Sequence, residues 1–169
     1  MQSLKYLTGY PVTITDSVQS LIDTNKLGAL LLKKYPTAHT IKTDKALYTY
    51  GIELKNTFLR QSQPISKIVY DDKIQVIQHA LGTHSFISRI QGSQLKVKNE
   101  IKIASVFKQV PMEFLTMILV HELAHLKEKE HNKAFYKLCT YMQPAYHHYE
   151  LELRIYLTYV DVFGKLYSH

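Results

Sequence analysis

His121, Glu122 and His125 form an HExxH sequence, and no other feature of the chain constrains its fold as strongly. Two residues four positions apart on an α-helix are separated by about 40° of rotation and one turn, so both imidazoles can bind one ion at about 2.0–2.1 Å. Glu122 lies one residue further round, where its carboxylate can take a proton from the attacking water and deliver it to the leaving group. The chain must therefore carry a helix across this segment.

The neighbouring residues indicate that this helix lies in the core. Pro111 suits the first turn of a helix, and the pattern of apolar residues that follows has helical spacing and continues through His125. Residues 117–120 and 123–124, which flank the histidines, are apolar as well. Since unpaired polar groups are costly in the core, this pattern favours a functional site over surface decoration. We predict a central helix from Pro111 to His125, with Glu122 as the catalytic residue.

A zinc site normally takes three or four protein ligands, so a third must come from elsewhere in the chain. His131, six residues after His125, is the first choice. An unbroken helix would rotate it by about 240° away from the other ligands, so the chain must bend between them. Asn132 favours the bend, because it is a good N-cap for a new helix over residues 133–142. The competing ligands lie after Pro144 on a last predicted helix: His147, His148, Glu150 and Glu152.

The N-terminal part of the chain reads as one helix over residues 15–35, because its apolar residues recur at roughly helical spacing. Tyr35-Pro36 ends this helix, since the residue before a proline avoids the helical conformation. The candidate N-caps are Thr15, Asp16 and Ser17.

The middle of the chain is rich in β-branched and aromatic residues, which indicates strands. Strands are expected over residues 65–70, 74–77, 86–90 and 95–107, with turns at Gly82 and around Gly92. Residues 46–59 fit either a strand or a helix, and the pattern leaves both open. The predicted fold is α+β and forms one domain over residues 1–169, with a small, mostly antiparallel sheet packed on helices.

Composition limits the kinds of protein that the chain can be. Apolar residues make up 46% and charged residues 21%, as in a globular protein. No secretory signal is visible, and the longest apolar stretch, 114–120, is far shorter than the ~20 residues of a membrane span, so we expect a cytoplasmic protein that binds no membrane. Cys139 is the single cysteine, so a metal site cannot be built from several cysteines and must rely on histidine and carboxylate. Cys139 itself lies on an apolar helical face and is predicted to be a core residue. The net charge of +7 allows weak association with nucleic acid.

The C-terminal half, from about residue 82 to residue 157, resembles the YgjP-like metallopeptidase family and is also akin to the WLM and SprT-like zinc peptidases. The residues that carry the likeness are 100–104, 110–111, 114–115, 120–126 and 131–136. The resemblance implies a zincin-like fold, one Zn²⁺ per chain held by His121, His125 and His131, and a family-variable part over residues 1–80. Arg89 and Gly92 stand where the family has an Arg-Trp-Gly-Ser-Cys segment, and this chain has no tryptophan.

The function predicted from these observations is that of a zinc metallopeptidase acting on a peptide or protein. Its extended substrate would lie beside the strand at residues 101–106. A donor to the tetrahedral oxyanion is also expected, and the candidates are His84, Arg89, Tyr146 and Tyr149.

Two other functions stay open. The first is a metal-dependent nucleotide pyrophosphatase, because some YgjP-like proteins are labelled UTP pyrophosphatases. The basic residues Lys96, Lys98 and Lys102 favour this function, whereas the lack of a Gly-rich phosphate loop counts against it. The second is a DNA-associated scaffold with a structural zinc. Glu122 argues against the scaffold, since a structural site has no need of that carboxylate.

Overall fold

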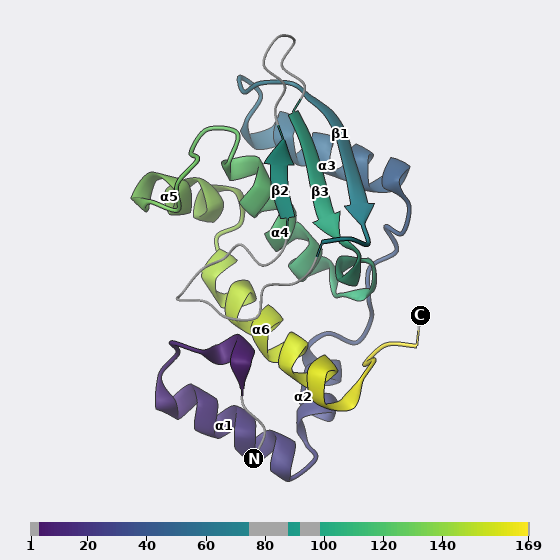
Figure 1. Cartoon of the computed structure of the whole chain (residues 1–169), viewed down its shortest axis with the longest axis vertical. Helices are drawn as coiled ribbons and strands as arrows, with labels where there is room; N and C mark the ends of the chain where they lie inside the picture. Colours follow the sequence, from purple (N-terminus) through teal and green to yellow (C-terminus); the bar gives the residue numbers. More distant parts are fainter. Residues whose placement is uncertain (1–3, 75–87, 92–98, 169) are drawn as a thin grey trace.

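A mixed three-stranded sheet forms one end of the molecule in the computed structural model, which describes residues 4–74, 88–91 and 99–168 (Figure 1). The strands are β1 (Ile65–Asp71), β2 (Ser88–Gln91) and β3 (Asn99–Ala104), in the order β1-β3-β2. β3 runs parallel to β1 and antiparallel to β2. The prediction of a mostly antiparallel sheet is wrong, because the longer of the two pairings is parallel. Alternating apolar residues define the buried face of a strand but not the direction of its neighbour.

The central strand β3 is paired along both of its edges. Ile101 pairs with Ile68 of β1 on one side and with Ile90 of β2 on the other. The strand ends at Ala104, and Ser105–Gln109 form a short 3-10 helix, η2, instead of continuing it. An extended substrate therefore cannot pair with residues 101–106, and that part of the sequence prediction is wrong. Parts of the other predicted strands (75–77, 86–87 and 95–98) and the turn glycines Gly82 and Gly92 lie outside the described residues.

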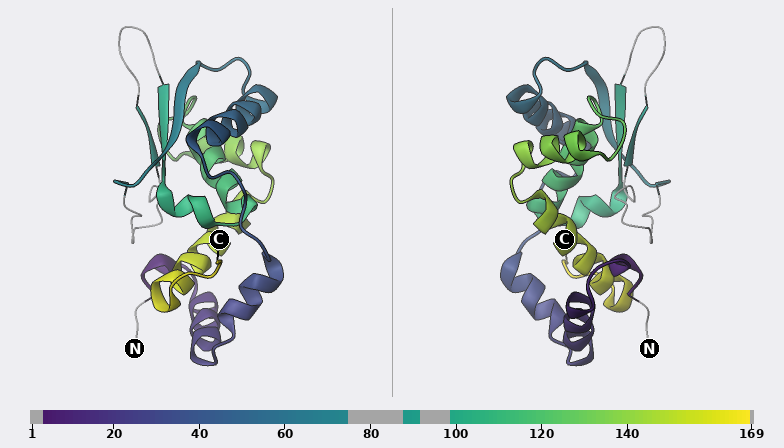
Figure 2. Two further views of the ribbon diagram at one scale, coloured as in Figure 1. Left: turned by 90° about the vertical axis from the view of Figure 1, so that its right-hand side faces the viewer. Right: turned by 90° about the vertical axis from the view of Figure 1, so that its left-hand side faces the viewer.

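The segment that the sequence left open is helix α3 (Asp44–Phe58). Thr43 caps it, because its side-chain oxygen accepts a hydrogen bond from the main-chain N–H of Ala46 at 3.1 Å. Gly51 lies so close to β1 that an added Cβ would overlap the side chain of Ile68. The edge-on views in Figure 2 show α3 and α4 on the same face of the sheet. α3 packs on β1, whereas α4 packs on β2 and β3.

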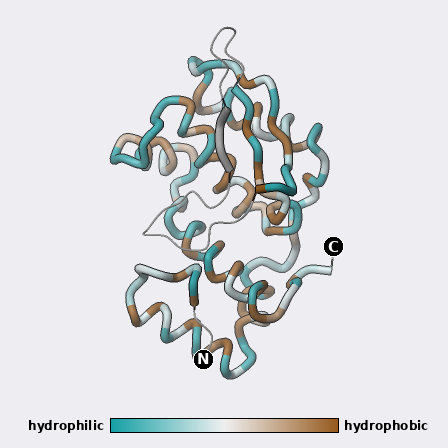
Figure 3. Tube along the Cα trace, in the orientation of Figure 1, coloured by the Kyte–Doolittle hydropathy of each residue, from teal (hydrophilic) through white to brown (hydrophobic). Residues whose placement is uncertain are grey.

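Helix α4 (Met112–Ala124) is the central helix that the HExxH sequence predicted, and it begins directly after Pro111. Ten of its thirteen residues are buried. It packs against β2, β3 and α3 on one side and against the later helices on the other. Figure 3 shows hydrophobic segments both at the sheet end and among the N-terminal helices, in line with two separate clusters of buried residues. Burial of one large apolar side chain stabilises the fold by about 1.5–3 kcal/mol. Since α4 buries more of its residues than it exposes, it is the centre of the main core.

The N-terminal segment contains two helices where one was predicted. After the short helix η1 (Lys5–Leu7), α1 (Val12–Asp23) and α2 (Leu27–Lys34) are separated by a turn in which Asn25 has a φ of 55°. Asn is among the few residues that adopt this conformation readily, so the break needs no glycine or proline. α1 begins at Val12, and the predicted N-caps Thr15, Asp16 and Ser17 all lie inside it. α2 ends at Lys34, before Tyr35-Pro36, as predicted.

Two further helices complete the chain, α5 (Lys133–Met142) and α6 (Tyr146–Phe163). One face of α6, with Tyr146, Leu153, Tyr156 and Leu157, packs on the main core. Another face, with Leu151, Ile155 and Tyr159, packs on a smaller cluster made of Leu7, Val18, Leu27 and Leu31. α6 thus connects the N-terminal helices with the sheet end of the molecule (Figure 1). Among the described helices, none is long and apolar enough to cross a membrane.

Candidate metal centre

The end of α4 brings the chain back towards its own histidines. The helix stops at Ala124, and His125 is its C-terminal cap residue with φ −66° and ψ −13°. Glu128 N–H donates to the carbonyl of Ala124 at 3.0 Å, which closes the turn without a glycine or proline. α5 then begins at Asn132, whose side-chain oxygen accepts a hydrogen bond from Phe135 N–H at 2.8 Å. The predicted bend and the predicted N-cap are both present, so His131 lies on a turn between two helices.

This turn places three histidines around one point. One nitrogen each from His121, His125 and His131 lies within 4.8 Å of the others. The Nε2 atoms of His125 and His131 are 3.1 Å apart. Ligand atoms about 2.0–2.1 Å from a tetrahedral ion lie about 3.3 Å apart, so this spacing is that of two ligands of one metal. His121 is buried, whereas the other two histidines are half-buried, as expected for a site with an accessible side.

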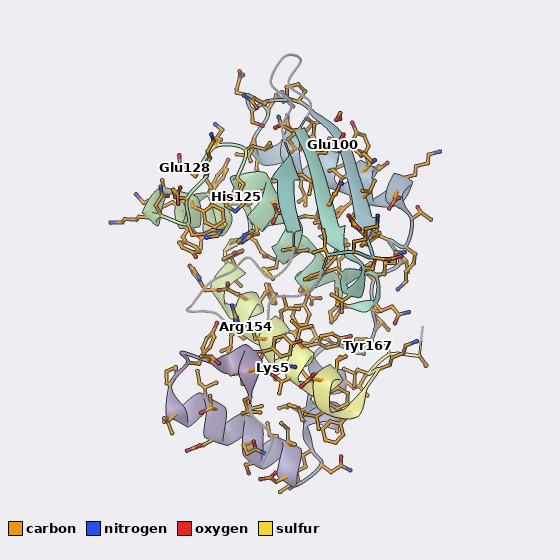
Figure 4. All side chains as sticks on the ribbon, viewed as in Figure 1. Lys5, Glu100, His125, Glu128, Arg154 and Tyr167 are labelled. Atoms are coloured by element: carbon orange, nitrogen blue, oxygen red, sulfur yellow. The ribbon has the colours of Figure 1, made fainter. Side chains whose placement is uncertain are left out.

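The nitrogens on the far side of two imidazole rings are already hydrogen-bonded. Nδ1 of His121 lies 2.8 Å from the hydroxyl oxygen of Tyr146, and Nδ1 of His125 lies 2.9 Å from the carbonyl oxygen of Glu128. A carbonyl can only accept, so the Nδ1 of His125 carries the hydrogen and its Nε2 keeps a lone pair. Partners of this kind fix the tautomer and orientation of metal-binding histidines. Figure 4 labels His125 and Glu128, which lie together on the turn between α4 and α5.

Phe135 packs against all three histidines. Its ring is fully buried, and its centroid lies 5.0 Å from that of His121, 4.6 Å from that of His125 and 4.9 Å from that of His131. Because Phe135 lies in the first turn of α5, the start of that helix forms an apolar wall behind the histidines. Rotation of the imidazoles away from their common point is therefore opposed by packing as well as by hydrogen bonds.

Glu122 lies beside this cluster, and only 1% of its surface is exposed. Its Oε2 atom is 4.0 Å from the Nε2 atom of His121. A carboxylate at that distance lies next to the point on which the three histidines converge, so it can reach a water molecule bound at that point. The arrangement provides three nitrogen ligands and a neighbouring proton acceptor, which are the parts needed to activate water for hydrolysis.

Comparison with known proteins agrees with this chemistry. The model of the YgjP-like metallopeptidase domain matches residues 69–156, about half of the chain, and this range includes Glu122 and all three histidines. The chain belongs to the YgjP-like family. It is 52% identical over 162 residues to a protein of Escherichia coli (strain K12) named UTP pyrophosphatase, and the match covers 96% of this chain and 97% of that protein. The family and this relative are hydrolases, and so is this chain. No solved structure matches it, so the zincin-like fold stays a prediction.

The competing ligands on α6 do not join the histidine cluster. Glu152 accepts hydrogen bonds from Lys34 and from the hydroxyl of Tyr35, so it connects α6 to α2. His148 is largely exposed and lies 3.8 Å from that same carboxylate. Glu150 is buried one turn along α6 from Tyr146 and is not part of the cluster of possible metal ligands among the described residues.

The other sequence candidates divide into those that the structure places and those that it does not. His84, Lys96 and Lys98 lie outside the described residues, and of Arg89 only the main chain, in β2, is described. Lys102 is on β3 and Tyr149 is on α6. Cys139 is fully buried, and burial raises the pKa of its thiol to about 12, which agrees with its assignment to the core.

Two residues around the site were missed or misread from the sequence. Phe135 was predicted only as an apolar residue on one face of the helix over residues 132–142, and Tyr146 only as a candidate oxyanion donor. Tyr146 is one of thirteen tyrosines, and its contact with His121 spans 25 residues of sequence, so no local pattern marks it.

Proposed function

We propose that this member of the YgjP-like family is a zinc-dependent hydrolase that cleaves a phosphoanhydride bond of UTP, giving UMP and pyrophosphate. The cluster of three histidines beside Glu122 supports the reaction class. The 52% identity with a UTP pyrophosphatase, over nearly the full length of both chains, supports the substrate. The net charge of +7 also suits a polyanionic substrate, because it raises the local concentration of anions near the protein.

His121, His125 and His131 are the residues that would hold the metal through their Nε2 atoms. Three neutral imidazoles leave a fourth position open to water or substrate, which is the pattern of catalytic rather than structural zinc sites. When bound, Zn²⁺ supplies a positive charge that polarises the substrate and lowers the pKa of water.

Glu122 provides the proton transfer in this proposal. Its carboxylate accepts a proton from the attacking water and returns it to the oxygen of the leaving phosphate group. Burial of Glu122 among apolar residues of α4 keeps bulk water from competing for that proton. A peptide bond would require the same two steps, with the leaving nitrogen as the final proton acceptor.

A metallopeptidase is the second candidate function, because the family model that matches the chain describes a metallopeptidase domain. The substrate would need a different position from the one expected from sequence, since β3 is paired on both sides. The outer edge of β2 has no strand partner within the described part of the chain, so an extended peptide can pair there.

The two functions are separated by assaying UTP and casein hydrolysis on the same preparations of wild type, metal-depleted wild type and Glu122→Gln. For the first proposal, wild type with zinc releases UMP and pyrophosphate in equal amounts, and metal depletion abolishes the reaction. Glu122→Gln keeps stoichiometric zinc but loses about 10²- to 10⁴-fold in kcat, the usual contribution of a general acid–base group. Cleavage of casein without any release of UMP would favour the peptidase. Unchanged activity in Glu122→Gln would refute the assigned mechanism for both substrates.

A further inference from the structure

We propose that Tyr146 is a positioning residue that fixes the orientation and the tautomer of His121 for metal binding. This inference rests on the metal centre proposed above and assigns it a fourth residue, one that is not a ligand. Tyr146 is the first residue of α6, and none of its surface is exposed. Its hydroxyl oxygen lies 2.8 Å from Nδ1 of His121, which is itself only 2% exposed.

The direction of this hydrogen bond follows from the role of the histidine. If His121 offers the lone pair of Nε2 to a metal, its hydrogen must be on Nδ1, and Nδ1–H then donates to the oxygen of Tyr146. A tyrosine hydroxyl can accept as well as donate, so the oxygen of Tyr146 can accept this hydrogen bond.

The position of Tyr146 is itself well determined. Its main-chain N–H donates to the carbonyl of Gln143 at 2.9 Å, which fixes the first turn of α6. Its ring lies nearly parallel to the imidazole of His121, with 18° between the planes. Nδ1 of His125 is hydrogen-bonded to a main-chain carbonyl, which no substitution removes. His121 depends on a side chain, so its orientation can be tested by mutation.

This geometry replaces the role of oxyanion donor that the sequence suggested for Tyr146. Nδ1 and Nε2 lie on different sides of an imidazole ring, and Tyr146 is on the Nδ1 side of His121. The substrate, by contrast, must bind on the side of the Nε2 atoms, where the three histidines converge. Tyr146 therefore acts on the reaction only through the histidine that it holds.

The test compares Tyr146→Phe with Tyr156→Phe, a matched control on the same helix. Tyr156 is also buried, and its hydroxyl donates to the carbonyl of Gln109 at 3.0 Å, so each variant loses one hydroxyl and one hydrogen bond. The measurements are the zinc dissociation constant, from competition with a chromophoric chelator, and the melting temperature of the metal-free protein. Loss of a partner of a metal-binding histidine typically weakens metal binding by about 10- to 100-fold.

We expect Tyr146→Phe to raise the zinc dissociation constant by that factor, while Tyr156→Phe binds zinc as wild type does and lowers the melting temperature by a similar amount. Equal dissociation constants for Tyr146→Phe and wild type would overturn the positioning role and leave the metal centre intact. Equal weakening in both variants would also overturn it, because loss of general stability would then explain the effect. Absence of zinc binding by wild type would instead refute the metal centre itself.

Discussion

Replacement of Asn132 by alanine tests whether the start of α5 holds the third histidine in place. Asn132 accepts a hydrogen bond from Phe135 N–H at 2.8 Å, and its amide donates to the carboxylate of Glu128 at 3.3 Å. Both bonds belong to the turn that carries His131, so their loss allows the first turn of α5 to fray. A frayed turn takes His131 and Phe135 away from the other two histidines together.

The size of the effect follows from the cap. Replacing an Asn N-cap with Ala costs about 1 kcal/mol, and the exposed contact with Glu128 adds little. For a chain of this length, that loss lowers the melting temperature of the metal-free protein by about 2–4 °C. If the whole loss appears as fraying, the fraction of molecules competent to bind metal falls by at most about fivefold, and the apparent zinc dissociation constant rises by the same factor.

Thr43→Ala is the matched control, because Thr43 caps α3 through its side chain in the same way and lies on a different helix. Both variants are compared with wild type by thermal unfolding without metal and by zinc competition. We expect similar melting temperatures for the two variants and weaker zinc binding for Asn132→Ala alone. If Asn132→Ala lowers the melting temperature but binds zinc like wild type, the turn holds His131 without its cap and the reasoning fails.

Three further predictions follow from individual contacts. His131→Ala should lose zinc during dialysis while His148→Ala, which alters an exposed histidine, retains it by elemental analysis; zinc bound equally by both would exclude His131 as a ligand. Burial lowers the pKa of His39 below 6.5, so around that pH the unfolded chain binds more protons than the folded one. The free energy of unfolding, measured with denaturant, should therefore fall as the pH drops below about 6.5, and it should fall less in His39→Gln. A raised thiol pKa leaves Cys139 with about a thousandfold less thiolate than an ordinary thiol, so iodoacetamide should label it only in denaturant; rapid labelling of the native protein would contradict its burial.

The parts of the site that the sequence predicted are those set by local geometry. The spacing of His121 and His125 is meaningful only on a helix, and Asn132 is a cap whose effect reaches three residues along the chain. The rotation of an unbroken helix required a bend before His131, and the chain bends there. Local rules sufficed because all of these relations lie within fifteen residues.

The parts that the sequence did not predict depend on relations between distant segments. Whether β3 runs parallel or antiparallel to β1 is decided by the path of the chain between them, and strand patterns carry no record of that path. Helical spacing continues on both sides of Asn25, so apolar periodicity alone could not separate α1 from α2. The ambiguity over residues 46–59 was resolved as a helix by contacts with β1 and α4, since Gly51 packs directly on both.

The same distinction bears on what an HExxH sequence can tell about a metal centre. The three histidines lie within eleven residues, but α5 supplies the ring that packs against them and α6 supplies the hydroxyl that orients His121. The motif therefore specifies which atoms can bind a metal, whereas the packing of the later helices decides how well they are held. Chains with the same motif and different helices after it should differ in metal affinity, because the partners that fix each imidazole are not part of the motif.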